Sequence, residues 1–89
     1  MDDDLLKQLR ESPEVHIGFK QFTRDIREGI VSFVVLAEDI DESIKLKVRV
    51  ECAAKKVPVH FVPSRIQLGK AVGIEVAASV VSAVCEKQE

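Results

Sequence analysis

Residues 44–56, IKLKVRVECAAKK, decide the fold because the first half of this stretch is compatible with two secondary structures. Apolar and charged residues alternate over residues 44–50, which is typical of a half-exposed strand. The apolar residues of the whole stretch also recur at helical spacing, in two sets: Ile44, Val48 and Cys52, and Leu46, Val50 and Ala53. Strongly apolar segments flank the stretch, and parallel strands there would need a crossover helix between them. We therefore predict a helix over residues 44–56.

The two flanking segments are predicted strands. IVSFVVLA (30–37) is almost wholly apolar and rich in β-branched residues, as in a central strand buried on both faces. VPVHFVP (57–63) has a similar character. Residues 31–36 and 59–62 are therefore expected to be interior strands. A strand at residues 44–50 would overturn this architecture.

Helices and strands alternate along the rest of the chain. The further predicted elements are a leading helix at 2–12 that stops before Pro13, a strand at 15–17, helices at 19–28 and 64–73, and a last strand at 76–84. Gly29 occupies a usual helix stop position, and Ser64 with Gln67 forms a capping-box pattern. The order predicts a three-layer α/β/α sandwich in one domain, residues 1–89, with an acidic leading segment (1–14) and a polar tail (86–89).

The formal net charge of −2 is unevenly distributed over the 89 residues. Residues 1–14 and 86–89 hold seven acidic and three basic residues, a net charge of −4. Residues 15–85 hold eight acidic and ten basic residues, a net charge of +2. The body of the chain is thus mildly basic, which permits an anionic partner without requiring one.

A basic stripe lies in GFKQFTRDIREG (18–29). Lys20, Arg24 and Arg27 fall on one side of the predicted helix, whereas Phe19, Phe22 and Ile26 fall on another. Taken alone, such a stripe is more often a solvated helix face than a binding site. The four phenylalanines, Phe19, Phe22, Phe33 and Phe61, lie in apolar patterns and are expected in the core.

No motif of catalysis or metal binding is present. The chain contains no Ser/His/Asp set, Walker loop or GxGxxG, and His16 and His60 lack a second ligand at metal-binding spacing. Cys52 and Cys85 lie far apart, as expected for reduced thiols. The start MDDDLL does not resemble a signal peptide, and no apolar stretch approaches the roughly 18 residues that cross a membrane. We expect a cytoplasmic protein that is not an enzyme and carries no cofactor or metal.

The chain resembles a known family, the L7Ae/L30e superfamily of ribosomal RNA-binding proteins. It is most similar to the short bacterial members that bind kink-turn RNA. Three segments carry the resemblance: Gly18-Phe19-Lys20-Gln21 with Arg24 three positions on, VVLAEDID (34–41), and KKVPVHFVPSRIQLGKAVGIEVAAS (55–79). The resemblance covers about residues 15–84. It implies an α/β/α sandwich with a mixed four-stranded sheet in the order 1-4-2-3.

The resemblance also implies three RNA-contacting segments. In the family, a helix start matched here by Gly18, Lys20, Gln21 and Arg24 enters the major groove of a sharply bent RNA, where sheared G·A pairs expose base edges. A loop matched by Ile74, Glu75, Val76 and Ala77 covers bases flipped out at the bend. Glu38 and Asp39 match an acidic turn beside the same surface. Phe19 departs from the family, which commonly has a small residue at this position.

The chemistry of the helix start is suited to RNA. A glycine at a helix start lets an RNA backbone approach the free N–H groups, which favour phosphate. Lys20 and Arg24 can neutralise phosphates or donate to guanine O6 and N7, and the Gln21 amide supplies a donor and an acceptor for a base edge. A-form duplex RNA hides its major groove, so such a helix needs a widened, kinked target.

The leading interpretation is a monomeric RNA-binding protein whose partner is a kink-turn in ribosomal or other non-coding RNA, with ribosomal or ribonucleoprotein proteins as further partners. The alternative is a protein-binding or assembly module on the same fold, and a small α/β enzyme is the remote third reading. Residues 74–77 are expected in an exposed turn, and Lys70 is an outlying candidate for a phosphate contact. Gly69, inside a predicted helix, indicates a close backbone approach by RNA or by a neighbouring element.

Overall fold

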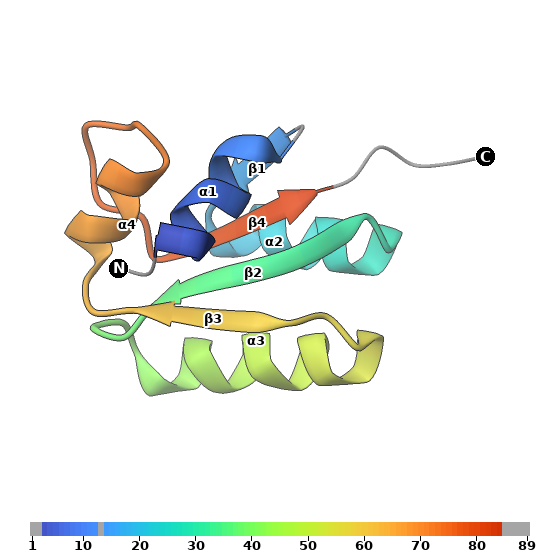
Figure 1. The fold of residues 1–89 in the computed structure, drawn as a ribbon. Coiled ribbons are helices and arrows are strands. Elements are labelled where there is room, and N and C mark those ends of the chain that lie inside the picture. The colour runs from blue at the N-terminus through green and yellow to red at the C-terminus, as the bar shows by residue number, and fades with distance from the viewer. Residues whose placement is uncertain (1–2, 13, 85–89) are drawn as a thin grey trace.

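The computed structural model describes residues 3–12 and 14–84 (Figure 1). The elements follow in the order α1 (Asp3–Glu11), β1 (Glu14–Ile17), α2 (Phe19–Glu28), β2 (Val31–Ala37), α3 (Glu42–Lys55), β3 (Val59–Val62), α4 (Arg65–Ala71) and β4 (Val80–Val84). Every predicted helix and strand is present, although several ends differ. Pro13 and Cys85 lie outside the described residues.

The sheet is mixed and has the order β1-β4-β2-β3, which confirms the predicted topology. Strands β2 and β3 are parallel, whereas β4 pairs antiparallel with both β1 and β2. The parallel pair is joined by α3, so the predicted helix over residues 44–56 is confirmed. In this helix Val48 is buried, whereas Leu46 and Val50 are 62% and 57% exposed on the opposite side. The apolar residues that alternate with charged ones in the sequence therefore lie on two different faces of one helix.

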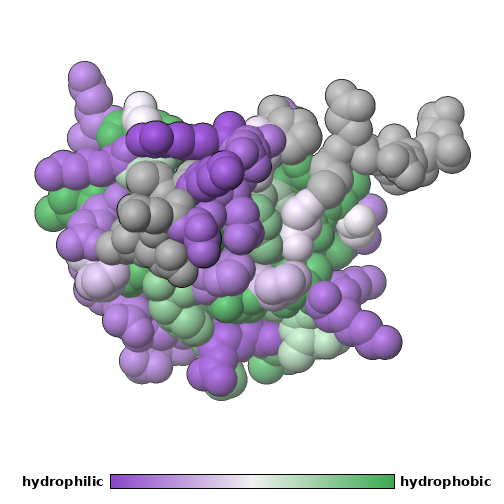
Figure 2. All heavy atoms as spheres, viewed as in Figure 1, coloured by the Kyte–Doolittle hydropathy of each residue, from purple (hydrophilic) through white to green (hydrophobic). Residues whose placement is uncertain are grey.

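Two hydrophobic clusters on opposite faces of the sheet produce the three layers. On one face, Leu5 and Leu9 of α1 and Leu68 of α4 pack against the sheet. On the other face the packing residues come from α2 and α3: Phe22, Ile26, Val48 and Cys52. Residues 34–37 of β2 are buried throughout, as expected for a central strand. Figure 2 shows hydrophobic residues reaching the visible surface between the hydrophilic ones.

The prediction of residues 59–62 as an interior strand is wrong, because β3 lies at the edge of the sheet and, among the described residues, pairs with β2 alone. Phe61, which was expected in the core, is 42% exposed for this reason. Pro58 and Pro63 flank the strand, and proline is typical of strand ends and edge strands because it cannot donate to a ladder. The other expected core phenylalanines are buried (Phe22) or packed half-buried against the core (Phe19 and Phe33).

The last strand begins later than predicted. Residues 76–79 form a loop, and β4 starts only at Val80. The small apolar residues of this loop favoured a strand in the sequence, but Ala78 is buried there without belonging to the sheet. Its N–H donates to the carbonyl oxygen of Arg65 at 3.1 Å instead of to a neighbouring strand.

Several predicted local features are confirmed. Gly29 ends α2 with a positive φ of 72°, and the Ser64 hydroxyl accepts from the N–H of Gln67 at 3.2 Å, which caps α4. Cys52 is a free, buried thiol. Burial raises the pKa of Cys52 to about 11, so this thiol is unreactive at neutral pH.

Candidate nucleic-acid interface

Four segments meet at one end of the sheet, on the left in Figure 1. Strands β1, β2 and β3 end there, and β4 begins there. Three backbone hydrogen bonds hold the segments together: Gly18 N to Val80 O (2.9 Å), Ala37 N to Ser79 O (3.1 Å) and Glu38 N to Val62 O (2.8 Å). We call this surface the loop end and define it as the first turn of α2 with Gly18, together with residues 38–41, 63–64 and 72–79. All the sequence-predicted site residues lie on it or, for Arg24, one turn further along α2.

The first turn of α2 exposes its backbone at the loop end. Gly18 precedes the helix with φ 110° and ψ 153°, a conformation that favours glycine, and a Cβ added there would meet nothing within 4 Å. Gly18 provides no side-chain cap. Within the described residues, the N–H groups of Phe19, Lys20 and Gln21 have no hydrogen-bond acceptor. Such N–H groups favour an anion at the positive end of the helix.

The cations of α2 are available to a ligand. Lys20 and Arg24 are exposed, and no ion pair within the described residues engages either of them. Arg27 is also exposed but lies near the opposite end of the helix. Phe19, which departs from the family pattern, turns inward and packs half-buried against Phe22 with ring centroids 6.3 Å apart. The Phe19 side chain therefore does not cover the first turn of α2.

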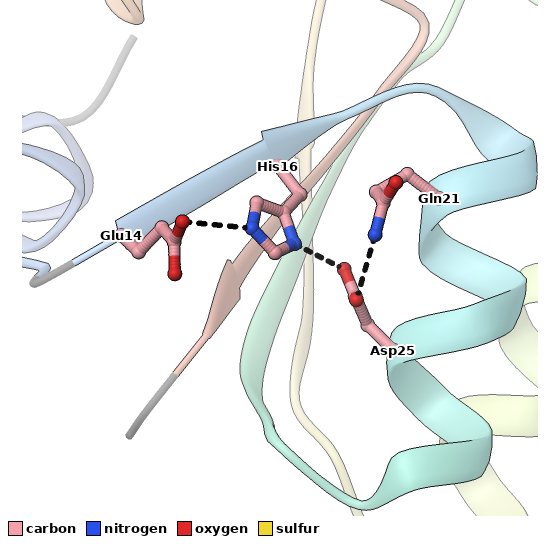
Figure 3. Close-up of polar contacts among 4 residues, drawn as sticks. All are labelled: Glu14, His16, Gln21 and Asp25. Atoms are coloured by element: carbon pink, nitrogen blue, oxygen red, sulfur yellow. Dashed lines mark hydrogen bonds and ion pairs between the residues drawn. The ribbon is translucent and has the colours of Figure 1, made fainter. Parts of the chain in front are cut away.

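Gln21 is held by a network that the sequence did not reveal (Figure 3). Its Nε2 donates to Asp25 Oδ1 at 3.0 Å, and the other carboxylate oxygen of Asp25 lies 2.7 Å from His16 Nδ1. His16 Nε2 in turn lies 3.2 Å from Glu14 Oε1. The bond to Asp25 raises the pKa of His16, and Glu14 adds to this effect against the opposing effect of burial. One of the two N–H groups of the Gln21 amide is thus already engaged.

The position of Asp25 in the sequence is a signal for this network. Asp25 lies directly before Ile26 and three residues after Phe22, so the helical wheel places its carboxylate beside the buried stripe. A carboxylate at such a position needs a hydrogen-bond donor. The donor is His16 of β1, which lies between Val15 and Ile17. His16 thus has a structural role, because it links β1 to α2.

The loop at residues 72–79 is tied down at both ends and exposed at its tip. Ile74 N donates to Gly69 O at 3.0 Å, and Ile74 packs half-buried against the core. The expectation that Ile74 is exposed is therefore wrong, because its side chain belongs to the core on the α4 side. The tip residues, Glu75, Val76 and Ala77, are exposed, with Val76 at 70%.

Gly69 explains how the loop can lie so close to α4. This residue is buried in α4, and a Cβ added to it would overlap the backbone carbonyl oxygen of Val76. The close approach predicted from Gly69 is thus made by a neighbouring segment of the same chain. Only glycine lets the helix and the loop touch at this point.

A hollow of about 280 Å³ lies between α4 and the loop. Its lining residues are Ile66, Lys70, Ile74, Glu75, Val76 and Ala77. Most of this lining is apolar, and Lys70 provides an exposed cation. A hollow with these walls is suited to the face of an unstacked base, because a base has apolar faces and lies next to a phosphate.

The acidic turn after β2 holds the loop end in shape. Asp39 Oδ1 accepts from the N–H of Arg65 at 3.0 Å and lies 3.5 Å from Arg65 Nε. Asp39 therefore fixes the start of α4 relative to β2. Glu38 is exposed at the same turn, where its carboxylate can face a ligand.

Two other kinds of site are absent from the described residues. Within residues 3–12 and 14–84, no group of three or more His, Cys, Asp or Glu side chains is placed to hold a metal ion. None of the helices described is both long and apolar enough to cross a bilayer. His60 forms an edge-on contact with Phe33, with ring centroids 5.7 Å apart, and so packs as a structural residue.

The sequence profile of the ribosomal protein L7Ae/L30e/S12e/Gadd45 family matches residues 3–89. The chain belongs to this family, which confirms the resemblance inferred from Gly18, the acidic turn and the run that ends at Ser79.

Two solved structures are similar to the chain. A protein of unknown function from Bacillus halodurans C is 26% identical with a TM-score of 0.76, over 92% of this chain and 79% of that protein. The 15.5kD RNA-binding protein of Giardia lamblia is 25% identical with a TM-score of 0.77, over 94% of this chain and 71% of that protein. The α/β/α fold is thus confirmed. The family is one of non-enzymatic proteins, and the chain is not an enzyme.

Proposed function

We propose that the protein binds RNA at the loop end and that its target is a kink-turn, a sharply bent RNA with sheared G·A pairs. The observation that carries this proposal is that two features share one end of the sheet. One is the start of α2, with its N–H groups that are unpaired within the described residues and the nearby cations Lys20 and Arg24, and the other is the exposed apolar tip of the loop at residues 72–79. Family membership and the similarity to an RNA-binding protein of Giardia lamblia support the RNA partner. Ribosomal RNA and other structured RNAs both belong to this class of target.

The shape of the helix start favours a bent RNA over a straight one. The major groove of an A-form duplex is deep and narrow, so the first turn of α2 cannot reach base edges there. A bend that widens the groove would let Gly18 approach a phosphate while Lys20 and Arg24 reach guanine O6 and N7.

The loop supplies a second kind of contact. An apolar side chain such as Val76 cannot read a base edge by hydrogen bonding, but it can cover the face of a base that has left the stack. The hollow beside α4 offers space for such a base, and Lys70 at its lining is placed to reach the adjoining phosphate. Together the two surfaces would recognise both the groove and the unstacked bases of one bend.

Replacing Val76 with Ser tests the contribution of the loop. Because Val76 is 70% exposed, the variant should remain folded. We expect a loss of about tenfold in affinity for a kink-turn RNA, since covering an exposed valine side chain contributes about 1.5 kcal/mol. Weak binding to a straight duplex should be unchanged, and so should the salt dependence, because no cation is removed. Fluorescence anisotropy at several salt concentrations measures both quantities.

The matched control for this variant is Leu46→Ser, which removes a similarly exposed apolar side chain from α3. It should leave the affinity for both RNAs unchanged. Equal losses on the bent and straight RNAs for Val76→Ser, or no loss on either, would remove the loop from the interface.

A second candidate function, a protein-binding module, is favoured by the outer face of α3. Leu46 and Val50 are exposed one helical turn apart, with the exposed cations Lys47 and Arg49 on either side of them. The complementary surface would be an apolar patch with an acidic rim on another protein. Leu46 and Val50 lie outside the surface defined as the loop end, so Leu46→Ser should impair protein binding while sparing RNA binding.

A further inference from the structure

We propose that His16 and Asp25 orient Gln21, so that the carbonyl oxygen Oε1 of Gln21, and not its amide nitrogen, faces an N–H group of an RNA base. This inference deepens the proposed RNA-binding function and rests on it. It makes Asp25 and His16 positioning residues, because Asp25 is buried and both residues act through the orientation of Gln21.

Asp25 is the centre of the arrangement. It is only 1% exposed, although it is a charged residue on a helix whose other side faces solvent. Both of its carboxylate oxygens are engaged, Oδ2 by His16 at 2.7 Å and Oδ1 by Gln21 at 3.0 Å. A buried carboxylate held from two sides cannot rotate to release either partner without leaving an oxygen unpaired.

The chemistry of a carboxylate determines which atom of Gln21 turns inward. An ionised carboxylate only accepts hydrogen bonds, so the amide nitrogen must face Asp25 (Figure 3). The oxygen of the Gln21 amide is then left for a ligand. Without Asp25 the two ends of the amide would be nearly equivalent in shape, and either could face the RNA.

His16 anchors this carboxylate to the sheet. The charged groups that face the imidazole are Glu14 on its own strand and Asp25 on α2, while β4 places the uncharged Ser82 opposite it. Both carboxylates favour the protonated ring, whose two N–H groups can donate to one each. The network therefore links the edge strand β1 to the first turns of α2, where Lys20 and Gln21 lie.

The consequence for recognition is a fixed pattern of donors and acceptors. Lys20 and Arg24 offer only donors, whereas Gln21 in this orientation offers an acceptor. Such a set matches a base edge on which an N–H group lies beside acceptor atoms. The inverted amide would present a third donor and would not match that edge.

Replacing Asp25 with Asn at pH 5.5 tests the orientation. At this pH, below the ordinary His pKa of 6.5, His16 is protonated and must donate to the oxygen of the introduced amide. The amide nitrogen at position 25 then faces Gln21, which must turn its own oxygen inward. We expect affinity for a kink-turn RNA to fall about tenfold. Simple electrostatics predicts the opposite, because the substitution removes a negative charge.

A pH profile separates orientation from mere structural damage. At pH 8 the neutral His16 ring of this variant can accept from the introduced amide, so that Gln21 regains its original orientation. The loss relative to the natural chain should therefore shrink between pH 5.5 and pH 8. A purely structural defect would not recover in this way.

A second substitution provides a rescue. Adding Gln21→Glu to Asp25→Asn places a carboxylate where it can accept from the introduced amide and present its other oxygen to the RNA. We expect this double variant to recover most of the affinity at pH 5.5, although its added negative charge by itself would weaken RNA binding. Its net charge equals that of the natural chain.

The outcomes distinguish this inference from the proposed function. If the natural chain does not prefer kink-turn RNA, the proposed function fails. If it does, but Asp25→Asn binds as tightly as or more tightly than the natural chain at pH 5.5, the orienting role is overturned.

If Asp25→Asn does not fold, NMR on the natural chain decides the question. One side-chain amide proton of Gln21 should exchange slowly, in contrast to those of the exposed Gln67. Equally fast exchange at the two residues would overturn the proposal.

Discussion

Replacing Lys20 and Arg24 together with Ala should weaken binding to a kink-turn RNA by roughly hundredfold, because a hydrogen bond to a charged group contributes about 1.5–3 kcal/mol. The slope of log K against log salt should fall by about 0.7–0.9 for each phosphate that is no longer neutralised. Both side chains are exposed, so the free energy of unfolding should change by less than about 0.5 kcal/mol. Anisotropy titrations at several salt concentrations, with a chemical denaturation curve for each variant, measure these quantities.

The control for this variant is Arg49→Ala with Lys55→Ala. It removes the same charge from exposed positions on α3, away from the loop end. Long-range attraction would weaken similarly in both variants, whereas only the α2 variant would lack direct hydrogen bonds to the RNA. An unchanged affinity and salt slope for the α2 variant would show that its basic stripe is solvated surface.

Replacing Gly69 with Ala should have the largest effect on stability. Alanine is favoured over glycine inside a helix by up to about 1 kcal/mol. Its Cβ would, however, overlap the carbonyl oxygen of Val76, and a backbone atom cannot move aside as a side chain can. Overpacking of this kind costs about 1–3 kcal/mol and occasionally more, and an overlap with a backbone atom belongs at the top of this range, so we expect a net loss of about 2 kcal/mol. The melting temperature should then fall by roughly 8–16 °C.

The same substitution should affect RNA binding, because the displaced backbone belongs to the loop at residues 72–79. Gly29→Ala is the control, since Gly29 has a positive φ of 72° and open space around it at the far end of α2. The control should lose about 1 kcal/mol of stability through backbone strain, with its affinity for RNA unchanged. A Gly69→Ala variant as stable as the natural chain would mean that the helix and the loop do not touch.

The layers of the fold were predictable because the apolar residues recur at helical spacing in some segments and form continuous runs in others. The continuous apolar run in β2 indicated a central strand, and the requirement for a crossover between parallel strands settled the ambiguous residues 44–50 as helix. The edge position of β3 was not predictable from its apolar content. An edge strand and a central strand differ in whether a further strand pairs with them, and hydropathy does not record that.

The candidate site was predictable only for side chains that point away from the core. The helical wheel placed Lys20 and Arg24 on an exposed stripe, and the structure shows them exposed. Ile74 was misjudged because a turn residue can still send its side chain into the core. The role of Asp25 depends on His16, nine residues earlier on another element, so local periodicity could not reveal their hydrogen bond.

The central claim is that the loop end recognises a bent RNA with sheared G·A pairs, and a binding comparison with one altered feature tests it most directly. The full chain would be titrated into a kink-turn RNA and into the same RNA with its G·A pairs replaced by Watson–Crick pairs. We predict roughly hundredfold tighter binding to the kink-turn, since each misread base pair costs about 1–3 kcal/mol. Equal affinity for the two RNAs would contradict kink-turn recognition.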